Sequence, residues 1–138
     1  MKVSILTFSQ TGNTLKAGSS IAKGLESGGF EVDQLSFLRR NRWKPDNADL
    51  IGIGSPVFEN RPAEVVTEYL KESRFDFTGK KAFVFITSGG SPAKSLWHLS
   101  QAVAGTGASV MGGIQLRGVS SFPTLSGLFP DRPNGRDL

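Results

Sequence analysis

The chain has 138 residues, of which 38% are hydrophobic and 20% are charged, and it has no cysteine. This length and composition predict one globular domain over residues 1–138. Without cysteine, disulfide bonds, a thiolate nucleophile and an iron–sulfur cluster held by thiolates of this chain are excluded. No apolar run approaches the roughly 20 residues that a membrane-spanning helix needs, so we predict no membrane partner. The absence of cysteine fits a cytoplasmic protein, which is the localisation that we expect.

The net charge of +4 favours an anionic ligand or an acidic partner. The basic residues are scattered, apart from one cluster formed by Arg39, Arg40, Arg42 and Lys44. No nucleic-acid-binding motif accompanies this cluster, so we predict no nucleic-acid partner. Its simplest interpretation is a solvated loop, and the functional alternative is docking of an acidic partner with Trp43 as a contact aromatic.

The first half of the chain predicts two strands around one helix, followed by a short connection. Residues 2–8 are apolar and β-branched, which is typical of a buried parallel strand. Apolar residues then recur at helical spacing from residue 13 to residue 28, and residues 30–36 alternate like an edge strand. Because residues 37–48 are polar and broken by Pro45, we expect a loop or a single helical turn there.

The second half of the chain predicts three more buried strands and two helices. The strands are expected at residues 49–55, 81–88 and 108–118. The helices are expected to begin at Pro62 and Pro92, since proline suits the first helical turn. Gly112 and Gly113 favour a break or bulge in the last strand.

The order of these elements predicts an α/β fold. We expect a doubly wound, five-stranded parallel sheet in the order 2-1-3-4-5, with helices on both faces. Residues 119–138 predict an irregular tail, so the last helix of such a fold is missing from the pattern. The tail, or a second copy of the chain in a homo-oligomer, would then cover the sheet face left bare.

The stretch TFSQTGNT (residues 7–14) joins the first predicted strand to the first predicted helix. A helix N-terminus offers unpaired N–H groups and the positive end of the helix dipole, which suit a phosphate. Gly12 allows a tight turn, and Ser9, Thr11 and Thr14 can donate hydroxyl hydrogen bonds. The loop lacks the lysine of a P-loop and the spaced glycines of a dinucleotide-binding loop. The alternative is that these hydroxyls serve only as a helix N-cap and in local turns.

Two further loops follow buried strands, SPVFENRP at residues 55–62 and TSGGSP at residues 87–92. Ligands of open α/β sheets bind at the carboxyl ends of the strands, where the strand order reverses. With the order 2-1-3-4-5, the first two loops flank one crevice and the third lies beside it.

The stretches TFSQTGNT, GIGSPVFENRP and FITSGG, in this order and spacing, resemble the flavodoxin-like family over roughly residues 2–118. The chain is most similar to the flavodoxin-like half of proteins that fuse such a domain to a two-cluster ferredoxin (EFR1-type proteins). Its first loop matches the family's FMN-phosphate pattern, Ser/Thr-x-Thr-Gly-x-Thr, at every defined position. The resemblance implies an FMN cofactor and a redox partner such as a ferredoxin or a ferredoxin domain.

The resemblance also implies a role for each loop. The FMN phosphate would be held by Ser9, Gln10, Thr11, Gly12, Asn13 and Thr14. The second loop would cover one side of the isoalloxazine, through Ser55, Pro56, Val57, Phe58, Glu59 and Asn60. The pyrimidine edge would lie near the backbone N–H groups of Thr87, Ser88, Gly89 and Gly90.

The chain departs from the family in its aromatic residues. Many flavodoxins cover both ring faces with aromatic side chains, but TSGGSP has none. Phe58 is the candidate for contact with one face, and its alternative is a partly exposed loop residue. Trp97 and His98 are expected to be packing or helix-surface residues, and Glu59 a solvated loop carboxylate. We predict no metal site and no catalytic triad.

Three functions are consistent with these residues. The first is an FMN-binding electron-transfer protein. The second is an NAD(P)H-dependent FMN quinone reductase, which needs an accessible flavin face. The third is a flavin-free, flavodoxin-like interaction module.

Overall fold

The computed structural model describes residues 1–9, 12–58, 61–73, 75–88 and 94–117. Its strands are β1 (Lys2–Thr7), β2 (Glu31–Ser36), β3 (Leu50–Phe58), β4 (Arg61–Pro62), β5 (Lys81–Ser88) and β6 (Ser109–Arg117). Its helices are α1 (Asn13–Ser27), α2 (Glu64–Glu72) and α3 (Ser95–Ala104), with two 3-10 turns, η1 (Phe37–Arg42) and η2 (Pro45–Asn47). No helix among these residues is long and apolar enough to span a membrane.

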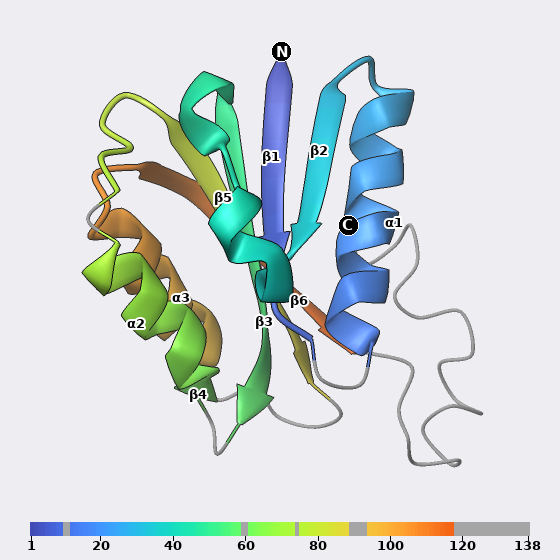
Figure 1. The fold of residues 1–138 in the computed structure, drawn as a ribbon. Helices are drawn as coiled ribbons and strands as arrows, with labels where there is room; N and C mark the ends of the chain where they lie inside the picture. Colours follow the sequence, from blue (N-terminus) through green and yellow to red (C-terminus); the bar gives the residue numbers. More distant parts are fainter. Residues whose placement is uncertain (10–11, 59–60, 74, 89–93, 118–138) are drawn as a thin grey trace, which may run out of the picture.

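The main sheet is parallel and has the strand order β2-β1-β3-β5-β6. This is the predicted 2-1-3-4-5 order, to which the structure adds the two-residue strand β4, paired antiparallel with β3. The sheet has α1 on one side and α2 and α3 on the other (Figure 1). The predicted doubly wound α/β fold is therefore confirmed.

The two faces of the sheet carry separate apolar clusters. On one face, the buried residues Val3 and Ile5 of β1 pack with Ala17 and Ile21 of α1. On the other, β3 and β5 pack against α2, α3 and the connection that follows β2. Strands buried on both faces read as continuous apolar runs, which is why β1, β3 and β5 were recognisable in the sequence.

The glycines of β3 make room for phenylalanine rings of the neighbouring strand. A Cβ atom on Gly54 would lie 2.2 Å from the Phe85 ring, and one on Gly52 would lie 2.4 Å from the Phe83 ring. Phe85 is fully buried, so its ring has no free space to move into. The GIG sequence of β3 is thus a packing requirement of the sheet.

The connection from β2 to β3 is short and firmly anchored. The sequence predicted a loop or a single helical turn here, and the structure instead has two 3-10 turns, η1 and η2, in which Phe37 and Pro45 are buried. The expectation that Trp43 is a contact aromatic is wrong. Trp43 is only 5% exposed and its indole N–H donates to the buried Ser4 Oγ at 2.7 Å.

Strand β6 contains a bulge close to the position that the sequence predicted. Ala82 pairs with Val110 and Phe83 pairs with Gly112, so Met111 has no partner in β5 and forms a bulge. The bulge lies one residue before the Gly112-Gly113 pair, where the sequence favoured it.

Gly54→Ala should destabilise the protein by about 1–3 kcal/mol, because the added methyl group displaces the buried Phe85 ring. Urea unfolding measures this, with Gly112→Ala as the control. A Cβ atom on Gly112 meets no atom within 4 Å, so that variant should stay within about 0.5 kcal/mol of the parent. Equal stability of the two variants would contradict the packing argument.

Trp43→Phe should cost about 1–3 kcal/mol, since it removes the indole donor and leaves the Ser4 hydroxyl buried without it. Trp97→Phe is the matched control, because Trp97 is 58% exposed and should tolerate the change. Thermal unfolding of both variants measures the two losses of stability. A larger loss for Trp97→Phe than for Trp43→Phe would contradict the structural role assigned to the Trp43–Ser4 hydrogen bond.

Candidate functional site

The three predicted loops begin at the same edge of the sheet. Thr7 pairs with Gly54 and Pro56 pairs with Thr87, so β1, β3 and β5 bring their carboxyl ends together. The Phe8 N–H also donates to the Gly54 carbonyl oxygen at 3.0 Å, which extends the contact one residue beyond β1. The arrowheads of these strands point to one end of the molecule (Figure 1). The predicted convergence of the loops is therefore observed.

The first loop ends at a helix N-terminus that has no side-chain cap. Gly12 is the N-cap residue, with φ of +91°, and no side-chain hydrogen bond caps α1 in the described part of the chain. The first turn also carries no acidic residue. Its N–H groups and the positive end of the helix dipole are thus available to an anion.

The hydroxyl of Ser9 supports this turn locally. Its Oγ accepts a hydrogen bond from the Gly12 N–H at 2.9 Å, and the Lys16 N–H donates to the Gly12 carbonyl at 2.9 Å. Ser9 is half-buried and its oxygen keeps its own O–H for a further acceptor. This accepted hydrogen bond agrees with the alternative interpretation, in which Ser9 stabilises a local turn.

A buried hydrogen bond joins the first loop to the third. The hydroxyls of Thr14 and Thr87 lie 2.7 Å apart, although the residues are 73 positions apart in sequence. Thr14 is 1% exposed and Thr87 is 5% exposed. Thr14 therefore ties α1 to the end of β5, and the orientation of both loops depends on this contact.

The second loop is braced by Ser55, which is fully buried. Its hydroxyl accepts a hydrogen bond from the Ala63 N–H at 2.8 Å and donates to the Pro56 carbonyl at 2.8 Å. Among the predicted site residues, Ser55 thus contributes its side chain to holding the loop against the start of α2. Sequence reasoning missed this brace, because its partner is a backbone group.

The second loop is also more regular than expected. The stretch from residue 55 to residue 62 was predicted as a loop, but β3 continues to Phe58 and pairs antiparallel with β4. Val57 pairs with Pro62 and Phe58 pairs with Arg61. The apolar pair Val57-Phe58 was the available signal for this extension, since such residues favour strands.

Several predicted site residues lie outside the described part of the chain: Gln10, Thr11, Glu59, Asn60, Gly89 and Gly90. The side chain of Phe58 also lies outside it. The half-buried residues Asn13, Pro56, Val57 and Ser88 lie at the same edge of the sheet as Ser9 and Gly12. The predicted role of each of these residues in cofactor binding stays a prediction.

Two buried hydroxyls near this edge have no hydrogen-bond partner among the described residues. They are Thr7 Oγ1, at the end of β1, and Ser95 Oγ, at the start of α3. A Cβ atom on Gly18 would lie 2.9 Å from Thr7 Oγ1, which places this hydroxyl directly beneath α1. Unsatisfied buried groups are rare in folded proteins, and neither was predicted from the sequence.

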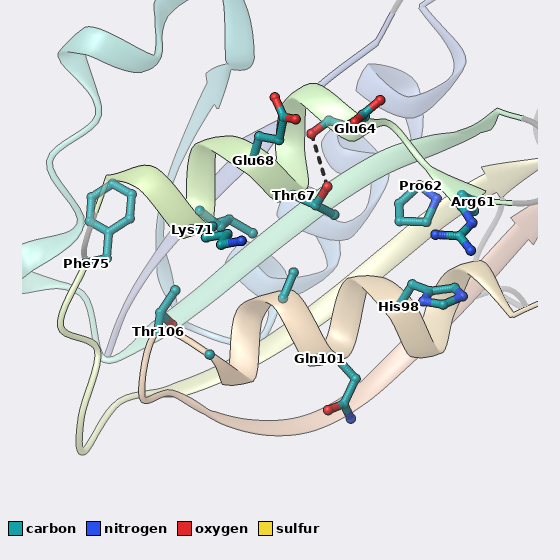
Figure 2. Close-up of a pocket in the computed structure, with 13 residues that line it drawn as sticks. Arg61, Pro62, Glu64, Thr67, Glu68, Lys71, Phe75, His98, Gln101 and Thr106 are labelled. Carbon is teal, nitrogen blue, oxygen red and sulfur yellow. Dashed lines mark hydrogen bonds between the residues drawn. The ribbon is translucent and has the colours of Figure 1, made fainter.

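A groove of about 910 Å³ lies between α2 and α3, and the last residues of the second loop, Arg61 and Pro62, line one end of it. Figure 2 shows Arg61 and His98 at one end of it, with Glu68 and Lys71 farther along α2. Its lining mixes both signs of charge. Among the described residues, no His, Cys, Asp and Glu side chains are grouped so as to hold a metal ion.

Trp97 and His98 lie on α3, and their rings meet edge-on with centroids 5.2 Å apart. Trp97 is 58% exposed and His98 is half-buried. Both were predicted as packing or helix-surface residues, and the structure places them on the helix surface.

No known protein-family profile matches the chain. Among curated proteins, it is similar to the uncharacterized protein MJ0298 of Methanocaldococcus jannaschii. The two are 29% identical over 134 residues, which covers 91% of this chain and 83% of that protein.

Solved flavodoxin structures share the fold. A flavodoxin from the domain Archaea has a TM-score of 0.72 at 24% identity and covers 85% of each chain. The two-electron reduced flavodoxin of Megasphaera elsdenii has a TM-score of 0.70 at 24% identity, over 82% of this chain and 84% of that one. A Fusobacterium nucleatum flavodoxin bound to flavin mononucleotide has a TM-score of 0.63 at 19% identity, over 80% of this chain and 68% of that one.

These likenesses confirm that the chain has the predicted flavodoxin-like fold. The narrower resemblance to ferredoxin-fused proteins stays a prediction.

The Thr14–Thr87 contact can be tested by a double-mutant cycle. Thr14→Val and Thr87→Val should each cost about 1–3 kcal/mol, because each leaves one buried hydroxyl unpaired. The double variant should cost less than the sum, since valine replaces both hydroxyls with groups of similar shape. Strictly additive losses in urea unfolding would show that the two hydroxyls do not interact.

Proposed function

We propose that this chain is an FMN-binding, flavodoxin-like electron-transfer protein. The observation that carries the proposal is the uncapped N-terminus of α1, which follows β1 at the point where the strand order reverses. This is where ligands of open α/β sheets bind. The proposal is supported further by the fold that the chain shares with flavodoxins, one of them bound to flavin mononucleotide.

The donors at this edge suit a phosphate in a neutral, hydrogen-bonding site. The N–H groups of the first turn of α1 would bind the phosphate, together with the hydroxyls of Ser9 and Thr11. Gly12 presents no side chain there, and a Cβ atom on it would meet no described atom within 4 Å. The residues described at the site therefore fit the phosphate end of FMN.

Two other loops would hold the ring of the cofactor. The loop after β3 would lie against one side of it, and the N–H groups after β5 would lie near its polar edge. Ser55 would keep the first of these loops on α2, and Thr14 would keep the second in register with the phosphate loop. When bound, FMN supplies the redox chemistry, while these residues position it and exclude water.

FMN and riboflavin titrations test the proposal, because riboflavin has the ring but not the phosphate. The purified protein should bind FMN and show a flavin visible spectrum. Ser9→Ala with Thr11→Ala should weaken FMN binding by at least about tenfold, since both variants remove phosphate donors. Riboflavin binding should change little, and isothermal titration calorimetry measures both ligands.

Ser27→Ala is the matched control, because the Ser27 hydroxyl donates to Lys23 at the far end of α1. Equal weakening for FMN and riboflavin would refute the phosphate assignment. A protein that binds no flavin would instead favour the interaction module. Steady-state oxidation of NAD(P)H with a quinone would favour the reductase. This function needs an accessible flavin face, which the absence of an aromatic residue in TSGGSP would permit.

A further inference from the structure

The connection after β2 carries a basic surface beside the candidate site. We define this basic surface by Leu38, Arg39, Arg42 and Lys44, all of which are exposed, with Leu38 at 80%. The connection begins directly after Ser36, which pairs with Thr7 at the carboxyl edge of the sheet. The basic surface thus starts at the same edge as the three loops.

Buried aromatic residues hold this surface in place. The Phe37 ring packs edge-on against Phe8, with centroids 5.5 Å apart, and against Tyr69, with centroids 5.2 Å apart. Phe8 is the residue directly before Ser9 of the phosphate loop. At the other end of η1, Trp43 is buried and bonded to Ser4. The exposed cations are therefore carried on a turn that is fixed at both ends.

Arg40 is the one arginine of the cluster that serves the fold. Its guanidinium lies 4.6 Å from the centroid of the Phe37 ring and donates to the Phe37 carbonyl at 3.2 Å. In contrast, Arg39, Arg42 and Lys44 form no ion pair and no side-chain hydrogen bond with the residues that the structure describes. Nothing in the described packing explains their positive charge.

The shape and chemistry of this surface fit a protein partner. Its residues do not line the groove between α2 and α3, and its cations are exposed on a turn. An exposed leucine among unpaired cations resembles the apolar centre and polar rim of a protein interface. The only aromatic residues of the connection, Phe37 and Trp43, are buried, so it has no platform on which nucleic-acid bases could stack.

We propose that the basic surface docks an acidic electron-transfer protein and places it next to the candidate FMN edge. The identity of the partner as a redox protein rests on the proposed function, whereas the preference for an acidic surface rests on the charges alone. Complementary charge would steer the partner toward the edge where the flavin would be accessible.

Binding of an acidic plant-type [2Fe–2S] ferredoxin tests this proposal. Isothermal titration of the protein, with and without FMN, should show binding at about 20 mM salt that is largely lost at about 500 mM, because screening removes the attraction. Arg39→Gln with Arg42→Gln should weaken binding by at least about tenfold at low salt. A basic cytochrome c should not bind at this surface.

The matched control is Lys23→Gln with Lys81→Gln, which removes the same charge from exposed positions on α1 and at the start of β5. Equal losses for both double variants would overturn the proposal, because net charge would then explain the binding. Salt-independent binding would overturn it as well, as would tighter binding of a single-stranded oligonucleotide through the same arginines. Circular dichroism would confirm that every variant is folded.

This test separates the two proposals. FMN binding without any ferredoxin binding would refute the basic surface as a docking site and leave the proposed function intact. Ferredoxin binding that depends on Arg39 and Arg42, in a protein that binds no flavin, would support the surface and refute the proposed function.

Discussion

The pairing of β1 with β3 at the centre of the sheet determines where every candidate functional residue lies. The chain runs outward from β1 through α1 to β2, and then returns across the sheet to β3. Because the connections leave β1 and β3 in opposite directions, the strand order reverses between these two strands, and ligands of open α/β sheets bind at such a point. The first and second loops begin on either side of this reversal for that reason.

Close packing maintains this central pairing. The rings of Phe83 and Phe85 occupy the space left by Gly52 and Gly54, so β3 and β5 fit together only with glycine at those positions. The buried Thr14–Thr87 hydrogen bond then joins α1 to the end of β5. Buried side chains thus fix the geometry in which a cofactor would bind.

The chain carries a net positive charge, and part of it lies beside the candidate site. The net charge is +4, and three exposed cations, Arg39, Arg42 and Lys44, lie on an anchored turn beside the candidate site. In the same segment, aromatic anchors are buried while the cations are exposed. In this one short connection, buried side chains therefore pack into the core, while charged side chains remain exposed on the surface.

The sequence by itself determined the alternation of strands and helices and the chemistry of the three loops, and it predicted a strand order that the structure then established. Hydrophobic periodicity and turn residues are local signals, and the rules for parallel sheets convert them into a topology. Only the tertiary structure decided that Trp43 is a core residue, that Ser55 braces a loop and that β3 continues into a hairpin with β4. It also decided that Thr14 meets Thr87. Each of these four features depends on a contact with a side chain or a backbone group elsewhere in the fold. Local patterns in the sequence do not encode such contacts.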